Sequence, residues 1–159
     1  MTSLKILTKK KMKTILFAAT MLFVSVATVA QQLSADKIIG VWEDVDSDLA
    51  LKFEFYKAGD KYFGKLLYAS DMFEADGKTP KKDFKNPDKA LQNRSRYGIT
   101  NITNLTFDKG EYLNGTLYNP DEGRNYSVKV KLRNLNEMDY RAYMGIALLG
   151  RSMTFKRVQ

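Results

Sequence analysis

Residues 49–56 spell Leu-Ala-Leu-Lys-Phe-Glu-Phe-Tyr, a stretch in which apolar and charged side chains alternate. Leu51, Phe53 and Phe55 fall on one face, and Lys52 and Glu54 fall on the other. A period of two is the side-chain period of a β-strand. The stretch therefore predicts a strand with one face buried in a core and one face in water.

The same alternation recurs along the rest of the chain. Residues 126–133, Tyr-Ser-Val-Lys-Val-Lys-Leu-Arg, repeat it with an almost fully cationic outer face. Weaker segments of the same kind occupy residues 38–45, 61–69, 98–107, 112–119, 138–144 and 152–158. The connections at 58–60, 108–110 and 119–123 have the composition of hairpin turns. About eight strands in a row predict an all-β fold, an antiparallel up-and-down barrel whose closure removes exposed strand edges.

One long connection departs from this pattern. Residues 70–96 are rich in Lys, Asp, Gly and Pro, and loops of this length inside compact domains are uncommon and often functional. A loop at the rim of a barrel is a natural lid, and single helical turns are expected over 34–39 and 88–93. The basic side chains of the loop indicate either a solvated surface or a contact for an anionic head group or acidic polymer: Lys78, Lys81, Lys82, Lys85, Lys89, Arg94 and Arg96.

Residues 1–30 have the pattern of an export signal. Four lysines within residues 9–13 precede the apolar run 15–30, which ends in the small residues Thr28 and Ala30. We expect cleavage before Gln31, with Met12 as an alternative start, and a single β-barrel domain over 31–159. The apolar run is short for a membrane span, so no stable span is expected after cleavage. The predicted location is the periplasm or the extracellular space.

Composition excludes several classes of function. Five of the 26 basic residues and none of the 18 acidic residues precede residue 31, so the remaining chain carries a net charge of only +3. A nucleic-acid partner normally requires a stronger basic bias, and we expect none. The chain contains no Cys and no His, which excludes disulfides, thiol and imidazole catalysis, and the usual zinc ligands. No metal and no cofactor are expected.

Carboxylates are the remaining candidates for chemistry. Residues 44–48 resemble the start of a calcium-binding loop, but Leu49 occupies the position that requires Gly, and Phe55 that of the bidentate Glu. Paired carboxylates could serve glycoside hydrolysis. Most acids here lie in turns or on polar faces, where their pKa values are expected to be ordinary. We therefore expect no enzyme.

Gly40-Val41-Trp42 opens the first predicted strand, and an arginine occurs in the last. This combination resembles the signature of the calycin group, which includes the lipocalins. The resemblance implies that Trp42 closes one end of the barrel and that an arginine packs across its face as a structural plug. Arg157 is the favoured partner because it shares the inward parity of Met153 and Phe155, and Arg151 is the second choice.

Four blocks in order resemble the uncharacterised bacterial family called domain of unknown function 2147. They are residues 40–42, residues 86–88 leading to 96–98, residues 115–126, and residues 145–158. The resemblance implies an exported bacterial protein with a lipocalin-like barrel and no established activity. It supplies no catalytic residues.

Two functions remain open. The first is binding of a small apolar or amphipathic, lipid-like ligand inside the barrel; the alternative is an envelope module with a filled core that binds a protein or polysaccharide. A cavity on the order of several hundred Å³ would favour the first function. The interior positions predicted to bind the ligand are Leu51, Phe53, Phe55, Leu66, Tyr68, Tyr118, Tyr126, Val128, Val130, Tyr140 and Met144.

Overall fold

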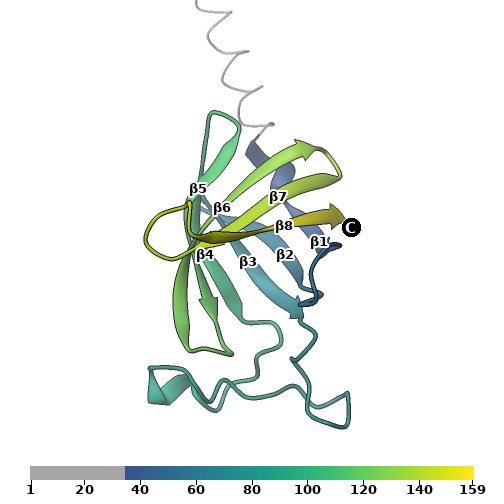
Figure 1. The fold of residues 1–159 in the computed structure, drawn as a ribbon, viewed down its shortest axis with the longest axis vertical. Helices are drawn as coiled ribbons and strands as arrows, with labels where there is room; N and C mark the ends of the chain where they lie inside the picture. Colours follow the sequence, from purple (N-terminus) through teal and green to yellow (C-terminus); the bar gives the residue numbers. More distant parts are fainter. Residues whose placement is uncertain (1–34) are drawn as a thin grey trace, which may run out of the picture. The chain divides into compact units, whose positions relative to one another are not determined.

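The computed structural model describes residues 35–159, whose strands form a closed barrel (Figure 1). The predicted signal peptide, its cleavage before Gln31 and the alternative start at Met12 lie outside the described residues. In chain order the elements are the 3₁₀ turn η1 (Asp36–Ile38), β1 (Gly40–Asp44), β2 (Lys52–Ala58), β3 (Lys61–Tyr68), the 3₁₀ turn η2 (Lys89–Leu91), β4 (Thr100–Asp108), β5 (Glu111–Asn119), β6 (Arg124–Asn134), β7 (Glu137–Tyr143) and β8 (Gly150–Arg157).

Each strand pairs antiparallel with its neighbours in sequence, and β1 pairs with β8 to close the barrel. The predicted eight-stranded, up-and-down antiparallel barrel is confirmed. In such a barrel successive connections alternate between the two ends. The β2–β3, β4–β5 and β6–β7 turns therefore share one end. The β1–β2, β3–β4, β5–β6 and β7–β8 connections share the other.

The end of the barrel with the β2–β3, β4–β5 and β6–β7 turns is filled by aromatic side chains. Phe53 stacks on Tyr140 and Phe155, with ring centroids 6.0 and 5.7 Å apart. Tyr62 meets Tyr112 edge-on at 5.3 Å. All five side chains are buried. Rings at these separations have the geometries that aromatic pairs prefer, so this half of the barrel is a packed core.

Trp42 and Arg157 close the packed half. The guanidinium carbon of Arg157 lies 4.3 Å from the centroid of the fully buried Trp42 ring, and Trp42 Nε1 donates a hydrogen bond to the Ile38 carbonyl at 2.8 Å. Gly40 is required here because its φ is +131° and a Cβ would lie 2.5 Å from Arg157 Nη1. The guanidinium also donates to three backbone carbonyls, those of Lys37, Ile39 and Leu135.

The connection between β3 and β4 lies at the opposite end, in the lower part of Figure 1. This long loop, residues 69–99, carries pairing of its own through the isolated bridges Phe73–Pro80 and Lys82–Ser95. It also contains η2, which Asp88 caps by accepting a hydrogen bond from the backbone N–H of Ala90 at 2.9 Å. The loop therefore has a defined conformation at the end of the barrel opposite the packed aromatic half.

Candidate ligand-binding cavity

A cavity of about 800 Å³ lies at the end of the barrel where the long loop is found. Small-molecule sites typically measure about 300–1,000 Å³. Strands β2 to β8 and the loops at this end supply the wall, and Phe53 and Met153 are the wall residues that also adjoin the packed aromatic half. The barrel is thus solid in one half and hollow in the other.

Six of the residues predicted to bind a ligand lie in the cavity wall: Leu51, Phe53, Leu66, Tyr118, Tyr126 and Met144. Phe55, Val128, Val130 and Tyr140 point inward but are buried in the packed half, away from the cavity. The alternation places these four and most of the six wall residues inside the barrel, whereas Tyr118, which pairs with the exposed Asn125 beside the Leu117–Tyr126 pair, has the outward parity and contacts the long loop. It does not distinguish the filled half from the hollow one.

Tyr68 lies outside the cavity. Phe53 pairs with Leu66, whereas the neighbouring Lys52 pairs with Tyr68, so β3 has one extra residue at this point. A bulge of this kind reverses the side-chain parity beyond it. Tyr68 consequently lies beside Lys52 on the outer face, 40% exposed, with its ring centroid 6.1 Å from that of Phe73 in the long loop.

Several wall residues were not among those predicted. Leu117, Ala142 and Met153 lie on strands and share parity with predicted interior positions, so the alternation contains the signal for them. Met72, Leu148 and Leu149 reach the cavity from loops. Loop residues have no periodicity, and no sequence signal indicates their direction.

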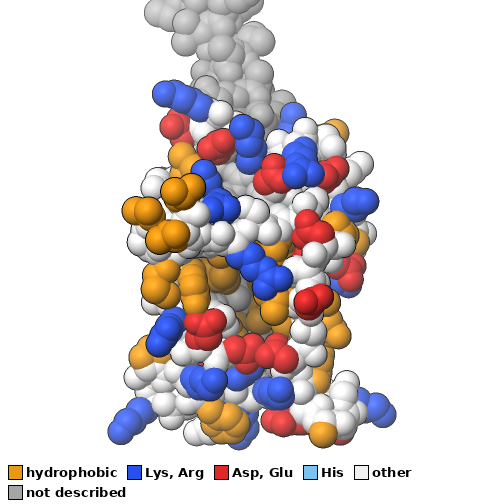
Figure 2. Space-filling model, viewed as in Figure 1, with side chains coloured by type: hydrophobic (Ala, Val, Ile, Leu, Met, Phe, Trp, Pro, Cys, Tyr) orange, Lys and Arg blue, Asp and Glu red, His pale blue; other side chains and the backbone are white. Residues whose placement is uncertain are grey.

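The β7–β8 loop forms an apolar rim at the cavity. In Figure 2 hydrophobic side chains gather at this loop, beside a hollow in the surface. Arg141 holds the loop in place by donating to the carbonyls of Ala147 at 2.7 Å and Leu148 at 3.1 Å. Apolar side chains of the rim are half exposed or more: Met144, Ile146, Leu148 and Leu149.

A polar part of the wall comes from the long loop and the β5–β6 turn. Arg96 is 7% exposed and donates from Nε to the Lys82 carbonyl at 3.1 Å and from Nη1 to Asp121 Oδ1. A hydrogen bond that protonated Asp71 donates to Asp121, together with burial, raises the pKa of Asp71. Burial acts to raise the pKa of Asp121, but the bond to Asp71 and the charge of Arg96 lower it below the ordinary value. Asp121 is therefore the charged member of the pair and Asp71 the one that keeps a proton longer.

Glu122 organises the neighbouring polar groups of the β5–β6 turn. Its Oε1 accepts from Asn119 Nδ2 at 3.2 Å, and its Oε2 accepts from the Tyr126 hydroxyl. That second bond raises the pKa of Tyr126. Asn119 Oδ1 in turn accepts from the backbone N–H of Asp121 at 3.0 Å. These groups satisfy one another within the protein.

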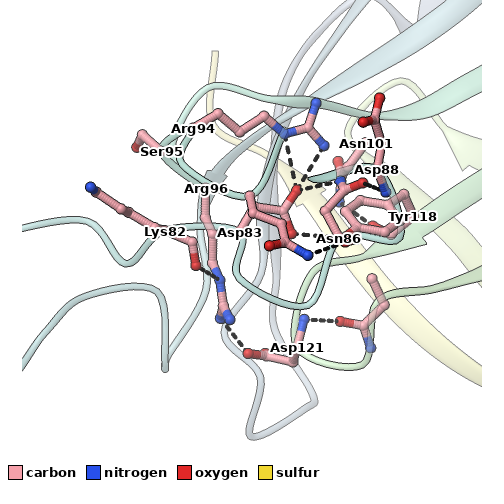
Figure 3. Close-up of polar contacts among 12 residues, drawn as sticks. Lys82, Asp83, Asn86, Asp88, Arg94, Ser95, Arg96, Asn101, Tyr118 and Asp121 are labelled. Carbon is pink, nitrogen blue, oxygen red and sulfur yellow. Dashed lines mark hydrogen bonds and ion pairs between the residues drawn. The ribbon is translucent and has the colours of Figure 1, made fainter. Parts of the chain in front are cut away.

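Asp83 attaches the long loop to the barrel, and Figure 3 shows the side chains that converge on it. The fully buried carboxylate accepts from Arg94 Nε and Nη2 at 3.0 and 2.9 Å, and from Asn86 Nδ2 at 2.8 Å. Its Oδ1 accepts from the Tyr118 hydroxyl of β5 at 2.7 Å. Burial and this bond raise the pKa of Tyr118 to about 12. A buried carboxylate with four donors is a strong attachment point.

A second attachment lies at the β5–β6 turn. Lys85 Nζ donates to the Asp121 carbonyl at 2.5 Å. Gly123 has φ +66°, and a Cβ there would lie 2.0 Å from the Lys85 carbonyl oxygen, so only glycine allows this approach. Among the basic residues of the loop, Lys85, Arg94 and Arg96 thus bind the loop to the barrel.

Asn101 is a wall residue whose side-chain amide oxygen, Oδ1, has no hydrogen-bond partner among the described residues. The side chain is 4% exposed, and its Nδ2 donates to the Tyr118 carbonyl at 3.3 Å. Among the described residues, Asn101 Oδ1 and the Tyr140 hydroxyl are the buried side-chain polar atoms that lack a hydrogen-bond partner. Asn101 lines the cavity, whereas Tyr140 lies in the packed half.

Within residues 35–159, no group of three or more acidic, His or Cys side chains is arranged to hold a metal ion. The same part of the chain contains no helix that is long and apolar enough to cross a membrane.

Comparisons with known proteins agree with the fold. Residues 40–157 match a family described as "Uncharacterized protein conserved in bacteria (DUF2147)". Among solved structures, the chain is similar to protein HP1028 from the human pathogen Helicobacter pylori, which is described as belonging to the lipocalin family. The two are 25% identical, the match covers 76% of this chain and 82% of that one, and the TM-score is 0.65. No curated protein matches the chain.

Proposed function

This chain belongs to the DUF2147 family of uncharacterized bacterial proteins, and we propose that it is an exported binding protein that holds a small amphipathic ligand inside its barrel. The cavity of about 800 Å³ is the observation that carries the proposal. A filled barrel would favour an interaction module instead, and here only one half is filled. An eight-stranded barrel is wide enough to hold one small ligand.

The wall of the cavity suits a molecule with an apolar body. Leu66, Leu117 and Met153 line it from the strands and Leu51 from just before β2, and the apolar rim of the β7–β8 loop continues it. Covering such a surface contributes about 25 cal/mol per Å² of apolar area removed from water. The polar part of the wall suits a head group at one end of that body.

The proposal assigns binding, and no reaction, to this site. Asp71 and Asp121 are carboxyl groups in one cavity, the arrangement that a hydrolase would need. They hydrogen-bond to each other, whereas the carboxyl groups of glycosidases are about 5–9.5 Å apart to admit a sugar or water. Asp121 is also ion-paired with the buried Arg96 and joins the loop to the barrel. These contacts support a structural role for the pair.

Export to the periplasm or extracellular space is part of the proposal and rests on the pattern of residues 1–30. The mass of the protein recovered from its own host tests it. We expect a chain that begins at Gln31. A chain that retains residues 1–30 would contradict export by cleavage.

Native mass spectrometry of the protein from its own host tests ligand binding. We expect one co-purifying small molecule per chain, released when the protein is denatured. A bare protein that also takes nothing from a lipid extract of the host would contradict the proposal. That result would favour the interaction module, whose docking surface would be the exposed β7–β8 loop.

A further inference from the structure

The β7–β8 loop exposes apolar side chains that the cavity does not explain. Ile146, Leu148 and Leu149 are each more than half exposed, and Ile146 lies outside the cavity wall. The loop stands out from the barrel on the left of Figure 1. Single apolar residues are normal on a protein surface, but several on one projecting loop indicate a contact with an apolar partner.

The conformation of this loop is fixed by hydrogen bonds. Arg141 donates to the carbonyls of Ala147 and Leu148, and the backbone N–H of Leu149 donates to the Ile146 carbonyl at 3.1 Å. An apolar side chain that stays in water forgoes the free energy of burial, which a flexible loop could recover by folding back onto the barrel. The fold instead holds these side chains outward.

The charges beside the loop suit an anionic surface. Residues 142–150 contain no charged side chain, and Arg141 and Arg151 flank them on either side. Neither guanidinium is paired with a carboxylate in the part of the chain that the structure describes. An apolar segment between two free cations matches a lipid surface, whose acyl chains accept the apolar side chains and whose phosphates attract the arginines.

A protein partner or a second copy of the chain fits this surface less well. A stable interface buries about 800 Å² on each partner, which is more than a few partly exposed side chains on one loop can supply. The outward positions of β7 and β8 next to the loop are polar and would add little apolar area: Arg141, Ser152 and Thr154. A bilayer needs only the loop itself to enter it.

We propose that the β7–β8 loop inserts into the surface of a lipid membrane, with Arg141 and Arg151 at the level of the head groups. Met144, Leu148 and Leu149 belong both to the loop and to the cavity wall, so apolar surface continues from the inserted loop into the barrel. An amphipathic ligand then passes between bilayer and cavity without its apolar body crossing water. This exchange rests on the proposed function, whereas insertion of the loop does not.

Co-sedimentation with sucrose-loaded vesicles tests the insertion. One set of vesicles contains equal parts of phosphatidylethanolamine and phosphatidylglycerol, and the other contains phosphatidylcholine. The protein is the one recovered from its host, with its start established by mass, because the apolar run within residues 1–30 would bind lipid by itself. We expect saturable binding that is tighter on the anionic vesicles.

Ile146→Ser removes one inserted side chain and should lower the affinity for the anionic vesicles about tenfold. The matched control is Leu135→Ser in the β6–β7 turn at the opposite end of the barrel, which should change nothing. Leu135 is 58% exposed and Ile146 is 61% exposed, so the two substitutions remove similar apolar surface. Arg151→Gln should weaken binding to the anionic vesicles about fivefold and leave binding to phosphatidylcholine unchanged.

Tryptophan fluorescence measures the insertion directly. The chain has a single tryptophan, Trp42, which is fully buried, so a second one on the surface reports its own surroundings. Vesicles should shift the emission of Ile146→Trp to shorter wavelength, because its indole enters an apolar medium. They should leave the emission of Leu135→Trp unchanged.

Three results would overturn the inference: no vesicle binding by the wild type, equal losses in Ile146→Ser and Leu135→Ser, or a dimer in solution that Ile146→Ser separates and vesicles do not. Binding of N-phenyl-1-naphthylamine by the wild type without vesicles tests the cavity separately. A protein that binds this dye but no vesicles would overturn the insertion alone. One that binds vesicles but no dye would contradict the proposed function and leave the insertion standing.

Discussion

Tyr140 lies at the centre of the packed half with a hydroxyl that has no hydrogen-bond partner among the described residues. Its ring stacks on that of Phe53 and packs at a tilt against that of Phe155, and burial raises its pKa. An unsatisfied buried hydroxyl lowers stability, whereas the ring beneath it contributes packing. Removing the hydroxyl of Tyr140 while keeping its ring should therefore not lower the stability of the protein.

Tyr140→Phe should leave the free energy of unfolding unchanged or raise it by up to about 1 kcal/mol, measured by denaturant unfolding. The matched control is Tyr118→Phe, which removes the bond to Asp83 and should cost about 1 kcal/mol. A Tyr140→Phe protein that is less stable than Tyr118→Phe would contradict this account of the packed half.

Arg157→Lys tests the plug. Lysine keeps the positive charge but loses the planar stack on Trp42 and the geometry that reaches three carbonyls. We expect a loss of about 2 kcal/mol in unfolding free energy. Arg124→Lys, at an exposed position at the start of β6, should change stability by less than about 0.5 kcal/mol. Equal effects of the two substitutions would show that Arg157 contributes only charge.

Among the elements, the long loop has one of its two attachments to the barrel at a buried carboxylate, Asp83. Asp83→Asn keeps the shape of the side chain but removes the ion pair with Arg94. Because the Arg94 side chain is 32% exposed, the loss is that of a hydrogen-bonded charge, about 1.5–3 kcal/mol, so transient opening of the loop should rise at least about tenfold. Tryptic cleavage within residues 70–96 measures this opening.

The matched control for this loop is Asp76→Asn. The Asp76 carboxylate is exposed and accepts hydrogen bonds from the backbone of Lys78 and Thr79 within the loop itself. The Asp76→Asn substitution should therefore leave tryptic cleavage of the loop near the wild-type rate. Unchanged cleavage in Asp83→Asn would mean that the loop is held elsewhere.

Tyr118 makes the same attachment sensitive to alkaline pH. Its pKa is raised from 10.0 to about 12, so the protonated hydroxyl is favoured in the folded protein. The stabilisation it contributes is fully present below pH 10 and is lost as the pH rises through about 12, when phenolate and Asp83 repel each other. The difference in phenolate absorbance between the wild type and Tyr118→Phe, followed as the pH is raised, reports the ionisation of Tyr118. Its midpoint should therefore lie near pH 12. A midpoint near 10 would contradict the bond.

The strands were predictable because each has one wet and one buried face. Alternation located all eight, and the resemblance to the calycin signature implied the contact of Trp42 with Arg157. At Gly115 in β5 a Cβ would lie 2.5 Å from Val128, so the strands approach closely there. The strand positions depend on local sequence alone.

The cavity was less predictable because it depends on depth along the barrel. Alternation assigns Phe55 and Leu66 to the same interior, although one is packed and the other faces the cavity. The bulge that turns Tyr68 outward has no signal in its own segment. Asn101 lies in a strand as an ordinary polar residue, and only its partners in space reveal its unpaired oxygen.

The barrel as a whole combines a rigid half with a receptive half. Aromatic packing and the Trp42–Arg157 plug fix one end, so they can hold the strands apart at the other. The long loop and the apolar β7–β8 rim surround the resulting cavity. We propose that the ligand binds at this end. One large side chain introduced into the wall would block the site.

Fluorescence titration with N-phenyl-1-naphthylamine tests that claim in the wild-type protein and in Ala142→Trp, which places an indole in the cavity. Ala58→Trp, at the exposed end of β2, is the control. The wild type and the control should bind one probe molecule per chain, and this binding should saturate. The Ala142→Trp protein, shown to be folded by its thermal unfolding transition, should lose this binding. No saturable binding by the wild type, or unchanged binding by folded Ala142→Trp, would contradict a ligand site inside the barrel.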